Sequence, residues 1–302
     1  MPVPALRTYH HSSFGAADLA AAKDGRVVSV CIPARNEGPT VGGIVASIRK
    51  HLVELAPVVD EILVIDDGST DDTADRSAEA GARVVPAGEV LSDHTSGPGK
   101  GQAMWKSVYA ARGDLIVWCD ADIANFGPRF IVGLLGPLLA HDDVDMVKAF
   151  YDRPSRDGTV GEGGRVTELV ARPLISRFFP RLSAVVQPLA GEYGGRRQVL
   201  EQLPFSPGYG VDLALLIDLV DRVGLDGLVQ VDLGVREHRN RPLSDLGPQA
   251  MAIIEMVLGR AGIDQPGAAT LIRPDQPPVT VEVDDLPPLA DLDLDLAARE
   301  SA

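Results

Sequence analysis

The sequence predicts an α/β fold built on a doubly wound, mostly parallel sheet. Apolar runs of strand length occur at 27–32, 61–65 and 115–119, and stretches with helical apolar spacing lie between them. Each run ends in a cluster of polar residues. This alternation is typical of parallel, right-handed βαβ units, whose ligands bind at the carboxyl ends of the strands. At 302 residues, the chain could form one large domain or two smaller ones.

In the first half of the chain, residue type and apolar spacing define each element in turn. The first run is rich in β-branched residues and ends at Pro33, as expected of a buried strand. The stretch after it has apolar residues three and four positions apart, which predicts a helix with one buried face. The expected strands are 27–32, 61–65, 83–85 and 115–119, and the expected helices are 39–51, 71–80 and 102–111.

The second half of the chain is less regular. A strand at 146–151 precedes a segment rich in Gly, Asp and Arg, 152–164, which we expect to be a mobile loop. Helical spacing continues over 166–179, where Pro173 predicts a break or kink. The remaining expected elements are helices at 213–223 and 246–260 and a strand at 228–233.

We expect four regions along the chain. Residues 1–24 are predicted to form a loose N-terminal arm, and 25–212 the main α/β domain. Residues 213–264 would form a smaller C-terminal part. The stretch 265–302 is rich in proline and acidic residues, which predicts a mostly disordered tail.

Composition and charge exclude several classes of protein. The net charge of −15 argues against nucleic acid as a bulk partner, and no apolar run reaches the ~18 residues of a membrane span. The N-terminus has no apolar signal core, so we expect a cytoplasmic protein that does not associate with membranes. Cys31 and Cys119 fall within expected buried strands, which predicts free thiols rather than a disulfide or a zinc site.

The strand at 115–119 leads into the most informative pair of residues, Asp120 and Asp122. Two carboxylates two positions apart project from the same side of an extended backbone. Hard oxygens at the end of a strand suit Mg²⁺ or Mn²⁺, which proteins often hold with one or two carboxylates and substrate phosphates. The pattern therefore suggests a glycosyltransferase whose metal ion holds the diphosphate of a nucleotide sugar. An acidic turn after a strand is the simpler alternative.

Polar residues at the ends of the other strands could complete a nucleotide site. Asp67 could accept a hydrogen bond from a nucleobase or a ribose, and Glu37 could accept one from the ribose. Lys100 lies in the glycine-rich turn 97–101, whose glycines would allow close approach to a diphosphate, although the turn lacks Walker A spacing. Each residue also has a simpler explanation: a solvated turn for Asp67, a helix-dipole interaction for Glu37 and a surface charge for Lys100.

Two basic segments could bind an anionic acceptor. Gly164, Arg165 and Thr167 begin a helix, and a helix N-terminus with an arginine and a hydroxyl group can bind phosphate or carboxylate. In the segment 235–241, alternate residues share one face if the backbone is extended. His238 in that segment could ligate a metal together with Asp122, or it could be structural.

Acidic residues in glycine-rich turns form a third group of candidates. Tyr209 and Asp212 lie in a loop that runs into a helix, and Glu192 lies in the turn 191–194. Either acid could bind sugar hydroxyls or cap a helix.

Together, these motifs resemble the glucosyl-3-phosphoglycerate synthases of actinobacteria, a family of retaining glycosyltransferases with the GT-A fold. The similarity extends from about residue 21 to 246. Motifs shared with many glycosyltransferases are 33–37, 68–72, 98–101 and 120–122, and longer motifs typical of this family are 164–174, 207–211 and 233–243.

The resemblance implies a role for each matching position. The donor UDP-glucose would be bound by Pro33, Ala34, Glu37, Asp67, Lys100, Asp120, Tyr209, Asp212 and Arg236. The acceptor 3-phosphoglycerate would be bound by Gly164, Arg165, Thr167 and Asn240. Asp122 and His238 would ligate Mg²⁺ or Mn²⁺, and the catalytic group would be Lys100, Asp122, Arg236 and Asp212. Residues 25–212 would then be the nucleotide-sugar-binding GT-A domain, 213–264 would serve acceptor binding and dimerisation, and the protein would be a homodimer.

Two positions depart from the family pattern: Asp67 stands where some members have serine, and Asp212 where glutamate is found. The expected reaction is transfer of glucose from UDP-glucose to the 2-hydroxyl of 3-phosphoglycerate, with retention. Alternatives in the same class are a mannosyl-3-phosphoglycerate synthase using GDP-mannose and a polyprenyl-phosphate glycosyltransferase. A nucleotide-sugar-binding regulatory protein without turnover is the alternative from another class.

Overall fold

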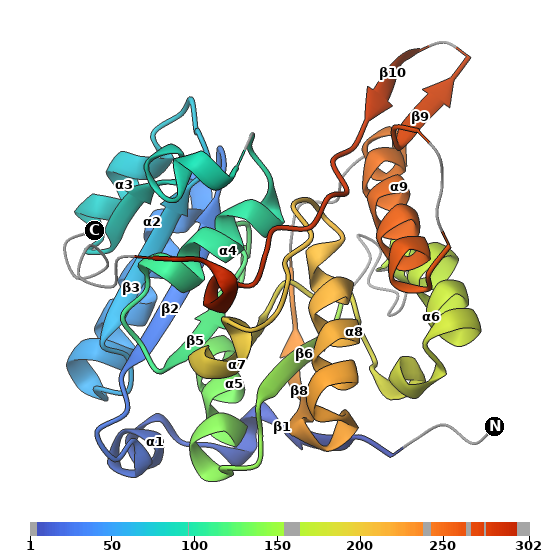
Figure 1. Ribbon diagram of the computed structural model, residues 1–302. Coiled ribbons are helices and arrows are strands. Elements are labelled where there is room, and N and C mark those ends of the chain that lie inside the picture. The colour runs from blue at the N-terminus through green and yellow to red at the C-terminus, as the bar shows by residue number, and fades with distance from the viewer. Residues whose placement is uncertain are drawn as a thin grey trace.

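A computed structural model describes residues 5–95, 97–153, 164–237, 243–263, 267–274 and 276–294. Within these ranges the chain forms an eight-stranded sheet with helices packed on both faces (Figure 1). The strand order is β1-β8-β6-β7-β5-β2-β3-β4, and every pair is parallel except the two made by β7. The predicted α/β class with a mostly parallel sheet is confirmed.

The predicted strands and helices appear close to their expected positions, with additional elements between them. The strands of the sheet are β1 (Arg7–His10), β2 (Val28–Ala34), β3 (Glu61–Asp66), β4 (Arg83–Pro86), β5 (Leu115–Trp118), β6 (Met146–Asp152), β7 (Tyr193–Arg196) and β8 (Leu228–Val235). The α-helices are α1 (Ala16–Ala22), α2 (Gly38–Ile48), α3 (Thr73–Glu79), α4 (Lys100–Ala110), α5 (Arg129–Ala140), α6 (Arg172–Phe178), α7 (Arg197–Leu200), α8 (Val211–Val223) and α9 (Leu243–Arg260). A π-helical segment, η5 (Thr167–Ala171), precedes α6.

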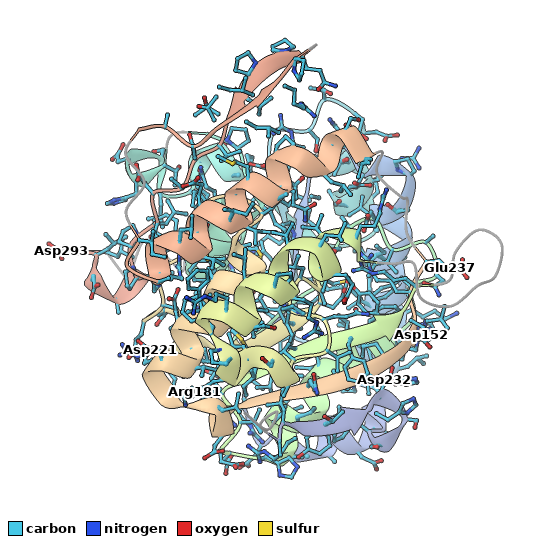
Figure 2. All side chains as sticks on the ribbon, turned by 90° about the vertical axis from the view of Figure 1, so that its right-hand side faces the viewer. Asp152, Arg181, Asp221, Asp232, Glu237 and Asp293 are labelled. Atoms are coloured by element: carbon cyan, nitrogen blue, oxygen red, sulfur yellow. The ribbon has the colours of Figure 1, made fainter. Side chains whose placement is uncertain are left out.

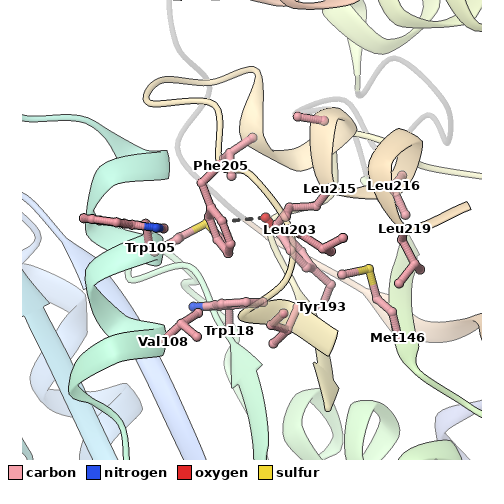
Figure 3. Close-up of a cluster of buried hydrophobic side chains, with 14 of the residues drawn as sticks. Trp105, Val108, Trp118, Met146, Tyr193, Leu203, Phe205, Leu215, Leu216 and Leu219 are labelled. Atoms are coloured by element: carbon pink, nitrogen blue, oxygen red, sulfur yellow. Dashed lines mark hydrogen bonds between the residues drawn. The ribbon is translucent and has the colours of Figure 1, made fainter. Parts of the chain in front are cut away.

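The two faces of the sheet carry separate hydrophobic cores. One core contains the apolar sides of α4 and α8, with Trp105, Trp118 and Phe205 among its largest buried side chains. Figure 3 shows Trp118 and Tyr193 close together in this core, and their ring centroids are 5.2 Å apart. The other core contains α2 and α5 and the opposite face of the strands. Because both faces are buried, the strands read as continuous apolar runs, which made them recognisable in the sequence.

Strand β7 was not predicted, because the sequence around it indicated a glycine-rich turn. It pairs antiparallel with both β5 and β6 in the middle of the sheet. A Cβ atom added at Gly194 would lie 2.4 Å from Val117 Cγ1 and 2.7 Å from the Ile116 carbonyl oxygen. Glycine is therefore required here for close packing against β5, although it has low strand propensity.

The predicted loose arm at 1–24 is wrong for the described residues. Strand β1 extends the sheet by pairing in parallel with β8, and α1 follows it. The ring of Phe14 packs against Gly136 of α5, where an added Cβ would lie 2.3 Å from the ring. Helix α5 was also missed, because almost all its residues are apolar and therefore show no helical periodicity.

The expected division after residue 212 does not match the structure. Helix α8 packs in the core beside α4, and β8 lies inside the sheet between β1 and β6. Helix α9 and a two-stranded hairpin of β9 (Thr270–Arg273) and β10 (Gln276–Thr280) stand apart from the sheet (Figure 1).

The prediction of a mostly disordered tail from 265 onward is wrong for the described residues. After the hairpin, the segment 281–294 runs across α4 (Figure 1). Trp105 Nε1 donates a hydrogen bond to the Pro287 carbonyl at 2.9 Å, and Phe205 and Leu286 exchange two backbone hydrogen bonds. Leu286 and Leu289 are buried. Average composition indicated disorder, whereas a few specific leucines order this segment by entering the core. In the described residues, no helix is long and apolar enough to cross a membrane.

Replacing Leu286 with alanine should reveal the contribution of this segment to stability. Leu286 is 7% exposed in the core, so L286A should lower the free energy of unfolding by about 2–4 kcal/mol. Leu55, which is 70% exposed at the end of the helical segment after α2, is the matched control, and L55A should change this quantity by less than about 0.5 kcal/mol. Urea unfolding measures both. Equal values for the two variants would contradict the observed packing.

Candidate active site

A cavity of about 640 Å³ lies at the carboxyl ends of the strands. Apart from Glu192, all the described residues that the sequence singled out for binding or catalysis line it: Pro33, Ala34, Glu37, Asp67, Lys100, Asp120, Asp122, Gly164, Arg165, Thr167, Tyr209, Asp212 and Arg236. The predicted residues His238 and Asn240 lie outside the described residues. The parallel strands thus bring together residues that are more than 200 positions apart in the chain.

Figure 2 shows how the strand ends form this edge. Asp152, at the end of β6, and Glu237, just beyond β8, lie on the same side of the molecule. The backbone N–H of Arg236 donates to the Asp152 carbonyl at 2.9 Å, which ties the two strand ends together. The Arg236 side chain therefore extends into the cavity, and the sheet holds its backbone in place.

Asp67 lies at one part of the cavity wall, beyond the end of β3. Its Oδ2 accepts a hydrogen bond from the Gly99 N–H at 3.0 Å. Burial raises the pKa of the Asp67 carboxyl to about 6, although the nearby Arg35 and the Gly99 N–H oppose the shift. An acid with this pKa can serve as a hydrogen-bond acceptor near neutral pH.

Lys100 begins α4 and joins two carboxylates. Its Nζ lies 3.1 Å from Asp212 Oδ1 and 3.3 Å from Asp120 Oδ1. Burial alone would lower the pKa of Lys100, but the two aspartates outweigh it and raise the pKa above the usual value. The ammonium group is therefore a fixed positive charge inside the cavity.

The glycines beside Lys100 have a role that the sequence did not reveal. A Cβ atom added at Gly101 would lie 1.8 Å from the Ser206 carbonyl oxygen, and one at Gly99 would lie 2.5 Å from that of Pro207. The Gln102 N–H also donates to the Pro207 carbonyl at 3.1 Å. The glycines thus allow the loop that leads to Tyr209 and Asp212 to pack on the start of α4.

Arg236 is the centre of the second charged cluster and is only 3% exposed. Its Nη2 donates to Asp120 Oδ2 at 2.9 Å and to Asp122 Oδ1 at 2.8 Å, while its Nε donates to Glu192 Oε1 at 3.0 Å. Burial alone would raise the pKa of Asp120, but Lys100 and Arg236 outweigh it and hold that pKa well below its usual range. Asp120 is therefore an anion in the folded protein.

The chemistry of Asp122 fits a hard divalent cation. Its side chain lines the cavity and is 26% exposed, so a carboxylate oxygen is accessible to an ion. Within the described ranges, no three His, Cys, Asp or Glu side chains are arranged so that they could together hold a metal ion. A site with few protein ligands is typical of Mg²⁺, which substrate phosphates and water help to coordinate.

The predicted acceptor residues begin the helical segment after the undescribed stretch 154–163. That stretch includes most of the loop that we expected to be mobile. Gly164 has a φ of 91°, a conformation that favours glycine, and the Glu168 N–H donates to its carbonyl at 2.9 Å. Thr167 is buried against the cavity wall, and Arg165 lines the same cavity. A hydroxyl group and a guanidinium group thus share the cavity with the aspartates.

Sequence reasoning missed several residues near the site. Lys148 of β6 is fully buried, its Nζ lies 3.8 Å from the Tyr193 ring centroid, and burial lowers its pKa to about 7. A lysine inside an apolar strand was the available signal. Arg153 and residues 280–282 also line the cavity, the latter because the C-terminal segment is ordered. Glu192, predicted to bind sugar or cap a helix, is absent from the lining and is fully buried behind Arg236.

Comparisons with known proteins agree with this geometry. The model of the family described as glycosyl transferase family 2 matches residues 29–188. The chain is 48% identical to the glucosyl-3-phosphoglycerate synthase of Mycolicibacterium paratuberculosis over 267 residues, covering 86% of this chain and 80% of that protein. It is also 48% identical to the Mycolicibacterium smegmatis protein of the same name, covering 86% of each.

Solved structures of the Mycobacterium tuberculosis glucosyl-3-phosphoglycerate synthase share the fold. The complex of that protein with Mn²⁺, UDP-glucose and phosphoglyceric acid has a TM-score of 0.85 and 45% identity, covering 94% of this chain and 98% of that one. Its complex with Mg²⁺ and UDP has the same TM-score and identity, covering 95% and 99%. The GT-A type predicted for the fold is confirmed by this match.

The raised pKa of Asp67 predicts a pH-dependent contribution to stability. Between its usual pKa of 3.8 and about 6, Asp67 binds more protons in the folded than in the unfolded chain. Its contribution to the free energy of unfolding should therefore fall as pH rises through this range. In urea unfolding between pH 4 and 7, the stability of the wild type relative to D67N should decrease with rising pH.

Asp71 is a control of opposite sign for this measurement. The Thr73 hydroxyl donates to Asp71 and lowers its pKa, so its contribution is lost as pH falls. Relative to D71N, the wild type should keep its stability from pH 7 down to about 4 and lose it below that, so this control is measured down to about pH 2. Parallel curves for the wild type and D67N would show that Asp67 titrates normally.

Proposed function

Because the chain belongs to glycosyl transferase family 2, and within it to the glucosyl-3-phosphoglycerate synthases, we propose that it transfers glucose from UDP-glucose to 3-phosphoglycerate. The product is glucosyl-3-phosphoglycerate, formed on the 2-hydroxyl with retention of configuration. One observation supports this function most directly. A single cavity combines a carboxylate pair suited to a metal ion, two fixed cations and the Arg165/Thr167 pair.

The donor occupies the part of the cavity formed by the ends of β2 and β3 and the start of α4. Pro33, Ala34 and Glu37 surround the nucleoside, and Asp67 accepts a hydrogen bond from the base. Tyr209 and Asp212 line the region of the sugar. The contact of Asp212 with Lys100 supports this placement. It brings Asp212, which is shorter than the glutamate expected at this position, close to the ammonium group that would bind the diphosphate.

Departure of UDP builds negative charge, and the chain supplies fixed positive groups for it. Arg236 is buried, Lys100 is partly buried, and carboxylates hold both, so they need little reorganisation when the charge develops. Asp122, together with His238, would hold Mg²⁺ or Mn²⁺, which acts as a Lewis acid on the diphosphate when bound. Asp120 lies beside both cations and keeps them in place.

The acceptor is held by the start of the helical segment at 164–167. Arg165 pairs with the phosphate or the carboxylate of 3-phosphoglycerate, and Gly164, Thr167 and Asn240 add hydrogen bonds. Fixing this small acid brings its 2-hydroxyl to the anomeric carbon.

Front-face attack is favoured over a covalent glycosyl-enzyme intermediate. The acids nearest the cavity are engaged: Asp120 and Asp212 contact Lys100, and Asp120 and Asp122 contact Arg236. Carboxylates neutralised in this way are poor nucleophiles. The high identity to glucosyl-3-phosphoglycerate synthases favours this reaction over transfer from GDP-mannose or to a polyprenyl phosphate.

We further propose a cytoplasmic homodimer. Cys31 and Cys119 are free thiols, as is common in reducing compartments. Leu243 of α9 and Ile272 of β9 are large apolar side chains that are 69% and 76% exposed. They support a contact between copies through the C-terminal part, which sedimentation velocity would test by a mass twice that of the 32.0 kDa chain.

A donor panel tests the proposed reaction. Purified protein is incubated with Mg²⁺, 3-phosphoglycerate and either UDP-glucose, GDP-glucose or GDP-mannose, and products are identified by mass spectrometry. We expect a glucosylated product, formed fastest from UDP-glucose. Absence of any glycosylated product would contradict the proposal. If only a mannosylated product forms, the donor is GDP-mannose and not UDP-glucose.

Removing the Lys100 ammonium should slow the transfer step. In K100A, kcat should fall by about 10²–10³ because the lost group stabilises charge on the leaving UDP. Lys50, an exposed lysine of the helix that follows α2, is the matched control, and K50A should retain wild-type kcat. Steady-state assays with UDP-glucose measure both. A K100A enzyme with unchanged kcat would remove Lys100 from the proposed role.

A further inference from the structure

Glu192 is a buried carboxylate with no part in the proposed chemistry. It lies directly before β7, its exposure is 0%, and it is absent from the residues that line the cavity. Burying a carboxylate is costly, and even a well-paired buried ion pair contributes little net stability. A role other than folding stability is therefore worth seeking.

Glu192 contacts the inner edge of Arg236. Arg236 Nε donates to Glu192 Oε1 at 3.0 Å, and Nη2 on the other edge reaches Asp120 Oδ2 at 2.9 Å and Asp122 Oδ1 at 2.8 Å. A guanidinium group is planar, and its N–H directions are fixed relative to one another. Holding Nε in place therefore determines where Nη2 points.

Glu192 is itself held on several sides. The Ala149 N–H donates to its backbone carbonyl at 3.0 Å, and the Tyr151 hydroxyl hydrogen-bonds to its carboxylate. Tyr151 is 2% exposed and accepts a hydrogen bond from Arg153 Nη2 at 3.0 Å, and its ring centroid lies 5.3 Å from Arg236 Cζ. The anchor of Arg236 is therefore much more rigid than a surface acid.

The chain next to Glu192 is also fitted to Asp120. A Cβ atom added at Gly191 would lie 2.1 Å from Asp120 Oδ2. Residues 191–192 thus touch both partners of the Arg236–Asp120 ion pair, the aspartate through a glycine and the arginine through the Glu192 carboxylate. Residues 191–192 therefore limit how far the Arg236 guanidinium and the Asp120 carboxylate can move relative to each other.

We propose that Glu192 is a positioning residue, which holds the Arg236 guanidinium with Nη2 directed at Asp120 and Asp122. This inference rests on the proposed function, in which Arg236 stabilises the leaving UDP. Without its inner anchor, the guanidinium would rotate, lose these contacts to the two aspartates, and no longer present a fixed charge to the diphosphate. Glu192 thus acts on the reaction through Arg236 without touching either substrate.

Two substitutions separate this role from simple packing. E192A removes the anchor, and we expect kcat to fall by about 10²-fold, with UDP binding in the presence of Mg²⁺ weakened by about 10-fold. E192Q keeps an oxygen that can accept from Arg236 Nε, so it should recover at least about 10-fold of the lost kcat. The KM for 3-phosphoglycerate should stay within about 2-fold of the wild type in both, because the acceptor is held elsewhere.

Glu61 provides the matched control. It is also a buried carboxylate paired with an arginine, with Oε1 2.7 Å from Arg83 Nη2. However, it lies at the start of β3, and the cavity lies at the other end of the strands. E61Q should lower the melting temperature and leave kcat and UDP affinity unchanged. If E192A and E192Q behave in the same way, with lower melting temperature and wild-type kcat, Glu192 is structural and the inference is wrong.

Failure of the proposed reaction can be distinguished from failure of this inference. If the wild type forms no product, calorimetry of UDP and a crystal structure of E192Q or E192A still report on Arg236. Should E192A fail to fold, E192Q decides, since its kcat must lie below that of the wild type. Wild-type contacts from Nη2 to Asp120 and Asp122 in E192A, with unchanged UDP affinity, would overturn the proposal.

Discussion

The site depends on one guanidinium group that joins three carboxylates from two segments of the sheet. Arg236 follows β8, Asp120 and Asp122 follow β5, and Glu192 precedes β7. The acids would repel one another without it, since they lie close together with little water to screen them. Lys100 extends the cluster by linking Asp120 to Asp212. The position of each acid therefore depends on the cations between them.

The sheet makes this arrangement possible. β5, β6 and β8 run in the same direction, so the residues that follow β5 and β8 reach one edge, and antiparallel β7 starts at that edge with Glu192. Gly194 and Gly101 have no side chain, which allows two backbone segments to pack closely at each position. In the proposed function, the same edge holds a nucleotide sugar and a small phosphorylated acid in one cavity, which is what transfer between them requires.

The C-terminal segment shows where composition misleads. Its prolines and acids predicted disorder, yet Leu286 and Leu289 enter the core beside α4, and residues 280–282 line the cavity. Average hydrophobicity describes the solvent-facing majority of such a segment. The few leucines that fix it are visible only when the surface that receives them is known, here around Trp105 and Phe205.

The sequence by itself determined the βαβ alternation, every parallel strand of the sheet except β1, and most of the residues around the cavity. Those features depend on local signals: buried β-branched runs, helical spacing and polar residues at strand ends. The tertiary structure alone decided the antiparallel β7, the edge strand β1, the ordered tail and the burial of Glu192 behind Arg236. Each of these features depends on contacts between segments that are far apart in the chain. The local sequence therefore does not show them: a glycine, a short polar strand or a single acid has its role only once the distant segment packs against it.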